Sequence, residues 1–125
     1  MDEQEFKNRT KNLALRTIKL ATSLPNNLAS NVIGKQLLRS ATSVGANYRA
    51  ACRAKSTADL ISKLSIVEEE ADESLYWLEL LEESELVKPA KLTQLKKDFD
   101  EIVAMLVFSI KTLRNKQIQN PKSKI

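Results

Sequence analysis

A chain of 125 residues with only 2 Gly and 3 Pro has the length of one domain and too few turn residues for a sheet-rich fold. Histidine is absent and Cys52 is the only cysteine, so we expect no zinc or other metal site, no cofactor, no catalytic residue and no internal disulfide. The formal net charge is +4 and 42% of the residues are hydrophobic, a composition that predicts a folded, all-α domain.

The first predicted helix runs from about Glu3 to Leu24, because core-type side chains recur there at steps of three and four. Pro25 ends it, since proline disfavours a helical residue before it. The second predicted helix, about Leu28 to Lys55, has the same spacing but a seam rich in small side chains. This seam consists of Gly34, Leu37, Ala41, Val44, Tyr48 and Ala51.

The third predicted helix begins at Ser56, whose hydroxyl can accept a backbone amide while Asp59 returns the bond three residues later. It continues to about Ser84 with a regular repeat of apolar and small side chains. The fourth has Pro89 in its first turn, where the missing amide proton costs nothing, and it runs to about Lys116.

Four helices with short connections predict an antiparallel up-down-up-down four-helix bundle over residues 1–118, followed by a flexible basic tail at 119–125. The first residues are acidic and polar, unlike a secretion signal. The longest apolar run, Ile102 to Phe108, is far shorter than a membrane span. We therefore expect a cytoplasmic protein with no membrane partner.

Two of the helices carry apolar side chains outside their core stripes. Trp77 and Ile66 lie roughly 100° from the seam of the third helix. On the fourth helix, Met105 and Phe108 are expected to point away from the core-facing residues. Such surface favours self-association, and a broad seam inside a single bundle is the alternative.

Charge is unevenly distributed along the chain. Residues 25–56 contain five basic and no acidic residues, whereas residues 57–88 contain ten acidic and two basic ones. Four cations of the second helix fall within one arc opposite its core stripe. We call this row the basic ridge, which consists of Lys35, Arg39, Arg49 and Arg53. It would bind phosphates or, alternatively, pair with the acidic third helix.

Polar residues beside the ridge suggest helix packing or a partner contact. A strip of small or neutral polar side chains runs next to it and includes Ser40, Ser43 and Asn47. On the third helix, Glu70 shares its face with Lys63 and Trp77, at the edge of an apolar strip. A carboxylate in that position needs a cation, either Lys63 or an arginine such as Arg53, and a structural role is favoured over a catalytic one.

Two stretches of the second and third helices are distinctive: QLLRSATSVGANYRAACRAKS at 36–56 and KLSIVEEEADESLYWLELL at 63–81. They resemble the corresponding stretches of the 23S rRNA intervening-sequence proteins, which are small bacterial proteins. The shared motif positions are Arg39, Ser40, Ser43, Asn47, Arg49, Arg53, Ser56, Lys63, Glu70 and Trp77. The chain departs from the family at Ala50 and Ala51, where a carboxylate and a glycine are common.

The resemblance implies an antiparallel four-helix bundle that assembles as a homopentameric ring, with no settled biochemical role. A related branch, the accessory proteins of diversity-generating retroelements, binds nucleic acid and contacts a reverse transcriptase. We therefore expect a non-enzymatic homo-oligomer, a pentamer, that binds the backbone of RNA or DNA through the basic ridge. The alternative is a protein-interaction scaffold with no nucleic-acid ligand, whose apolar surface binds a protein partner such as a reverse transcriptase.

Overall fold

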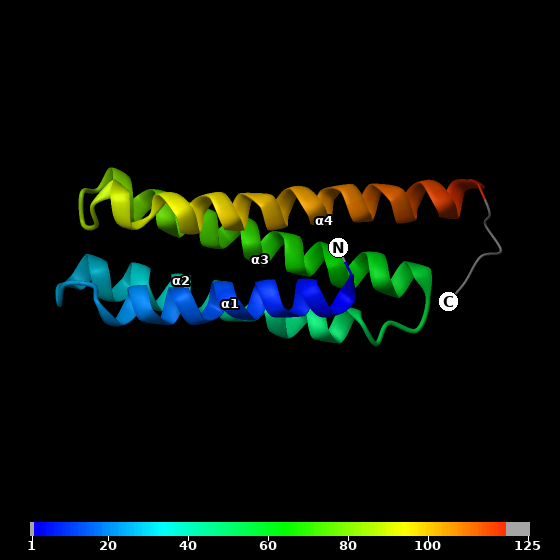
Figure 1. Ribbon diagram of the computed structural model, residues 1–125, viewed down its shortest axis with the longest axis horizontal. Helices are drawn as coiled ribbons and strands as arrows, with labels where there is room; N and C mark the ends of the chain where they lie inside the picture. Colours follow the sequence, from blue (N-terminus) through cyan, green and yellow to red (C-terminus); the bar gives the residue numbers. More distant parts are fainter. Residues whose placement is uncertain (1, 120–125) are drawn as a thin grey trace.

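The computed structural model describes residues 2–119, which form four long helices and no strand. They are α1 (Glu3–Thr22), α2 (Leu28–Ala51), α3 (Thr57–Glu83) and α4 (Thr93–Gln119), with a short 3-10 helix, η1 (Pro89–Lys91), before α4. The chain reverses its course at each connection between them (Figure 1). The predicted all-α class and the four helices are confirmed, and no helix in the described part is long and apolar enough to cross a membrane.

Side-chain caps fix the starts of the first three helices. The side chains of Asp2 and Asn27 each accept the backbone amide three residues later, at 2.8 and 2.9 Å. Ser56 accepts the amide of Asp59 at 3.1 Å, as expected at the start of α3. The return bond differs from the prediction, because the Asp59 carboxylate accepts the amide of Lys55, at 3.0 Å, and not that of Ser56.

Two predicted helix ends lie too far along the chain. α1 stops at Thr22, where the Ser23 hydroxyl donates to the carbonyl of Leu20 at 2.7 Å, before Pro25 can act. α2 stops at Ala51, because the amides of Arg53 and Ala54 each bond to the carbonyl three residues back, at 3.0 Å. This tighter turn replaces the helical ladder, which therefore does not reach Lys55.

The start of the last helix also differs from the prediction. Pro89 opens η1, in which the amide of Leu92 bonds to the Pro89 carbonyl at 2.9 Å, and α4 begins only at Thr93. At its other end α4 passes Lys116 and continues to Gln119, so the first residue of the predicted tail is helical. The remainder of that tail, 120–125, lies outside the described residues.

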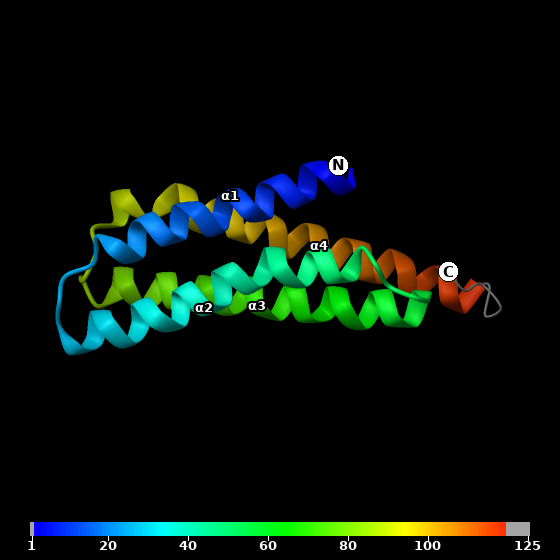
Figure 2. The ribbon, with the colours of Figure 1, turned by 90° about the horizontal axis from the view of Figure 1, so that it is seen from below.

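Close contacts of α2 with both neighbours position the basic ridge. On one side, the hydroxyls of Ser40 and Ser74 are fully buried and lie 2.8 Å apart, so α2 and α3 approach closely (Figure 2). On the other side, a Cβ atom on Gly45 would lie 3.3 Å from the Thr10 hydroxyl of α1. Two small residues of α2 outside its predicted seam, Ser40 and Gly45, thus form the close contacts with α3 and α1, and a common core lies between the helices.

Two ion pairs join α1 to α4, which have fewer close contacts than any two long helices that are consecutive in the chain. Arg9 pairs with Glu101 at 2.9 Å, and Arg16 with Asp98 at 2.7 Å. Burial acts to raise the pKa of Asp98, but hydrogen bonds from Arg16 and Gln94 outweigh it and hold that pKa below its ordinary value.

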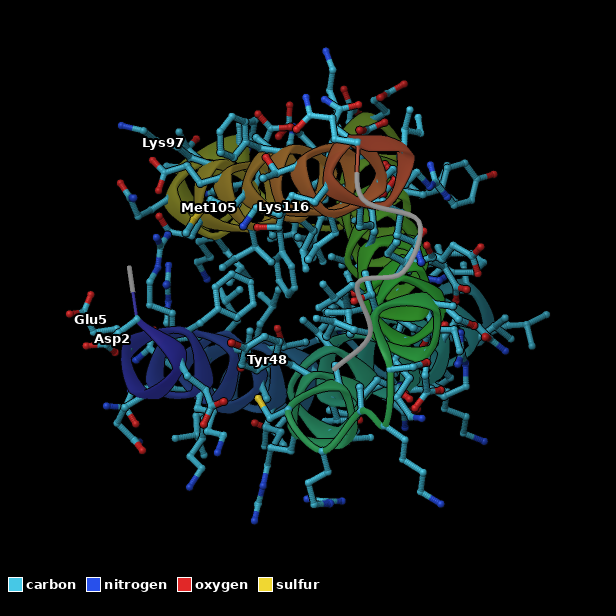
Figure 3. The ribbon with its side chains drawn as sticks, turned by 90° about the vertical axis from the view of Figure 1, so that its right-hand side faces the viewer. Asp2, Glu5, Tyr48, Lys97, Met105 and Lys116 are labelled. Atoms are coloured by element: carbon cyan, nitrogen blue, oxygen red, sulfur yellow. The ribbon has the colours of Figure 1, made fainter. Side chains whose placement is uncertain are left out.

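An apolar cavity of about 740 Å³ opens near the start of α1. Tyr48 and Met105 both line it, from the inner sides of α2 and α4 (Figure 3). The expectation that Met105 points away from the core is wrong, since this residue is half-buried against the core and Arg9 donates to its sulfur at 3.6 Å. Phe108 does point outward and is 71% exposed at the cavity rim. Trp77 is half-buried against the core, whereas Ile66 is 44% exposed.

Candidate nucleic-acid interface

All four residues of the basic ridge are exposed along α2 and the turn that follows it. Within residues 2–119, no salt bridge joins Lys35, Arg49 or Arg53 to a carboxylate. Their charges therefore face solvent in the isolated chain, where they can meet an anionic ligand. Lys35 and Arg49 are about 21 Å apart along the axis, from the rise of an ideal helix.

Arg39 differs from the rest of the ridge because two carboxylates of α3 hold it. Its Nη1 atom lies 3.0 Å from Glu70, and its Nη2 atom bonds to Glu73. The indole nitrogen of Trp77 donates to the same Glu73 oxygen at 3.0 Å. The Trp77 hydrogen bond and the Arg39 guanidinium hold the pKa of Glu73 below its usual range, and the carboxylates raise the pKa of Arg39.

Glu70 pairs with an arginine, as one of the two alternatives predicted, but the arginine is Arg39 and not Arg53. Lys63 contacts both oxygens of Asp59, one turn earlier on α3, at 2.7 Å. Lys63 and Glu70 are seven residues apart, or about 10 Å along the helix axis, too far for an ion pair. The Lys63 hydrogen bond lowers the pKa of Asp59, with a further contribution from the Lys55 amide. Glu70 therefore joins α3 to α2 through Arg39.

The strip of small polar residues directs its hydrogen bonds inward. Ser40 lies in the α2–α3 contact described above. The Ser43 hydroxyl donates to the Arg39 carbonyl at 2.7 Å, and the Asn47 amide donates to the Ser43 carbonyl at 2.8 Å. The side chains of Ser43 and Asn47 thus donate to carbonyls of their own helix, whereas the ridge cations of α2 are exposed to solvent.

Sequence reasoning missed a groove between α1 and α2, which we call the α1–α2 groove. It measures about 430 Å³, and it brings two lysines of α1 beside Arg49 of the ridge. Its lining residues are Gln4, Lys7, Asn8, Lys11, Ala14, Thr42, Gly45, Ala46 and Arg49. The spacing of Lys7 and Lys11, one turn apart, places both on one face of α1 and is the signal that the sequence offered.

Polar side chains as well as apolar ones line the apolar cavity. Burial raises the pKa of the Cys52 thiol and of the Tyr48 hydroxyl, so both groups are protonated near neutral pH. Cys52 is half-buried at the cavity wall. Within residues 2–119, no group of three His, Cys, Asp or Glu side chains is placed to hold a metal ion.

Comparison with known proteins identifies the family. The family model described as 23S rRNA-intervening sequence protein matches residues 2–108. The chain belongs to the 23S rRNA-intervening sequence protein family. A crystal structure of a protein with unknown function, from the S23 ribosomal protein family of Bacteroides thetaiotaomicron, is 40% identical with a TM-score of 0.81. That comparison covers 89% of this chain and 99% of the other, and no curated protein matches significantly.

The match to the 23S rRNA-intervening sequence protein family includes both basic features of the surface. The basic ridge and the α1–α2 groove lie within residues 2–108, whereas the last turns of α4 lie beyond them. The fold of the solved relative matches that of this chain over most of its length. A ligand that binds this surface would therefore contact the part of the chain that matches the family model.

Proposed function

We propose that this member of the 23S rRNA-intervening sequence protein family is a non-enzymatic protein that binds the phosphate backbone of RNA or DNA. The supporting observation is that Arg49 and Arg53 are exposed and, among the described residues, form no salt bridge. A guanidinium group can bind two phosphate oxygens at once. The family description names 23S rRNA, and that of the solved relative names a ribosomal protein family, which favours RNA. Such a ligand is cytoplasmic, and we propose that compartment.

Contacts of this kind read the charge and shape of a nucleic acid. Duplex DNA carries one negative charge per about 1.7 Å of its axis, so a row of cations along α2 can meet several phosphates. Phosphate contacts carry little sequence information, and we expect little discrimination between base sequences. Affinity should fall steeply as salt is added, because each neutralised phosphate releases counterions.

Reversing the charges of Arg49 and Arg53 is expected to weaken binding at least tenfold. The double variant R49E/R53E places two repelling charges on the proposed contact surface. Binding is measured by fluorescence anisotropy with a labelled RNA hairpin and a labelled DNA duplex at low salt. The matched control is K91E/K97E, which makes the same charge change at exposed positions in η1 and α4. Figure 3 shows Lys97 at the surface of the bundle. Equal affinities of the two double variants would contradict the proposal.

We also propose that antiparallel bundles of this chain assemble as a ring of five. Exposed apolar side chains on α4 support self-association: Val107 at 46%, Phe108 at 71% and Ile118 at 78% exposed. A ring would repeat the basic ridge and multiply weak phosphate contacts.

Native mass spectrometry is expected to give five times the mass of the single chain. The variant F108E should shift the distribution toward smaller species while keeping the helical circular dichroism of the wild type, because Phe108 is exposed within the chain. A monodisperse monomer of the wild type at micromolar concentration would refute the assembly.

The alternative function is a protein-interaction scaffold, and the Arg39 contacts favour it for that part of the ridge. There the cation binds Glu70 and Glu73 of its own chain instead of an external anion. A scaffold would bind a protein partner, such as a reverse transcriptase, through its apolar surface. Wild-type protein that binds neither labelled nucleic acid at low salt would favour this function.

A further inference from the structure

The two flanks of the basic ridge differ in charge. Toward α3, Arg39 meets Glu70 and Glu73, and the neighbouring helix is acidic over much of its length. Toward α1, the α1–α2 groove places Lys7 and Lys11 beside Arg49. A phosphate backbone that follows the ridge is therefore repelled on the α3 flank and attracted on the α1 flank.

We infer that the sugar–phosphate backbone of the nucleic acid lies in the α1–α2 groove, where Lys7 and Lys11 act with Arg49 as phosphate ligands. This inference rests on the function proposed above and makes that function specific, because it assigns contacts to a second helix. It also places Arg39 outside the contact surface, as a residue that holds α3 against α2.

The shape of the groove suits an extended backbone. Its lining includes Ala14, Gly45 and Ala46, which have at most one side-chain carbon. Gly45 lets α1 approach closely, since a Cβ atom there would meet Thr10 at 3.3 Å. The small side chains beside Lys11 and Arg49 leave room for phosphate oxygens to approach these two cations.

The polar groups of the groove are available to a ligand. Lys7 has one partner, Glu3, at 3.3 Å on the same helix, and such an exposed pair is weak in water and easily exchanged. Lys11 has no salt bridge among the described residues. Gln4 donates to the Asn8 side-chain oxygen at 3.0 Å, which leaves the Asn8 amide nitrogen as a donor for a phosphate or a sugar hydroxyl.

Neutralising the two lysines tests the inference through the salt dependence of binding. For K7Q/K11Q, we expect the slope of log affinity against log salt to decrease by roughly 1.8 for duplex DNA and 1.4 for single strands, or 0.9 and 0.7 per lost phosphate contact. Anisotropy titrations with a labelled RNA hairpin, a single-stranded RNA and a DNA duplex give the slopes and show which nucleic acid the groove prefers. The control K91Q/K97Q removes the same charge elsewhere and should keep the wild-type slope.

A second variant obstructs the groove without removing a cation. Ala46 is exposed and lines the groove, so A46E adds a carboxylate there and should weaken binding about tenfold or more, whereas A58E, at an exposed position of α3, should not. Circular dichroism confirms that each variant is folded.

Three outcomes separate this inference from the function on which it rests. Loss of affinity in both groove variants supports the groove. If R49E/R53E loses binding while K7Q/K11Q and A46E keep the wild-type affinity and slope, the groove is wrong and the proposed function stands. If the wild type binds none of the probes at low salt, the function itself is wrong.

Discussion

Replacing Leu78 by alanine is expected to lower the free energy of unfolding by about 2–5 kcal/mol. Leu78 is fully buried in the common core, on α3, which packs against both α2 and α4. Truncation removes its apolar contacts and leaves a cavity that the rigid neighbours fill only in part. The loss is a large fraction of the free energy of unfolding of a typical domain, which is about 5–15 kcal/mol.

The matched control is the same substitution at Leu28, the first residue of α2, which is 81% exposed. It should change the free energy of unfolding by no more than about 0.5 kcal/mol. Urea denaturation followed by circular dichroism measures both variants at one protein concentration. Similar losses for the two variants would show that Leu78 is not part of the core.

Replacing Ser74 by leucine is expected to lower the free energy of unfolding by about 1–3 kcal/mol through overpacking. Ser74 and Ser40 are fully buried with their hydroxyls 2.8 Å apart, so α2 and α3 leave little room for a larger side chain between them. The substitution also removes the hydrogen bond between the two hydroxyls.

The control for this prediction is Ser62→Leu, which introduces the same side chain at an exposed position of α3. It should leave the thermal midpoint nearly unchanged, whereas Ser74→Leu should lower it by several degrees. A Ser74→Leu protein as stable as the control would mean that the two helices separate without cost. In that case the close approach of α2 and α3 would not determine the position of the basic ridge.

The fold could be predicted because four apolar repeats leave little choice of element type. The ends of the helices depend on competition between local hydrogen bonds, which periodicity does not record. Asp59 had two backbone amides within reach and bonds to that of Lys55. Pro89 suits a 3-10 turn as well as an α-helical first turn, and it forms the former. The alternative hydrogen bonds at such helix ends differ in free energy by less than one hydrogen bond contributes.

The exposure of Arg49 followed from the phase of one helix, and the structure agrees with it. Arg53 is exposed as predicted, but it lies in the turn after α2 and not on the helix. The contacts of Arg39 depend on how closely α2 and α3 approach and on the rotamers of long side chains, so the sequence left two alternatives open. Met105 was misplaced because the inner face of α4 is wider than one stripe where the apolar cavity opens beside it. To predict the α1–α2 groove one must know how α1 and α2 are aligned with each other, and the apolar repeat of a single helix does not give this alignment.

The charged seam between α1 and α4 has a consequence for local opening. Its two ion pairs, Arg9 with Glu101 and Arg16 with Asp98, are screened by dissolved ions, whereas the apolar contacts elsewhere are not. Thermal fluctuations should therefore detach α1 before any other helix, and its amide protons should exchange fastest with solvent. A polyanion that binds both α1 and α2 would oppose the detachment of α1. Binding in the α1–α2 groove should therefore slow the exchange of the amide protons of α1.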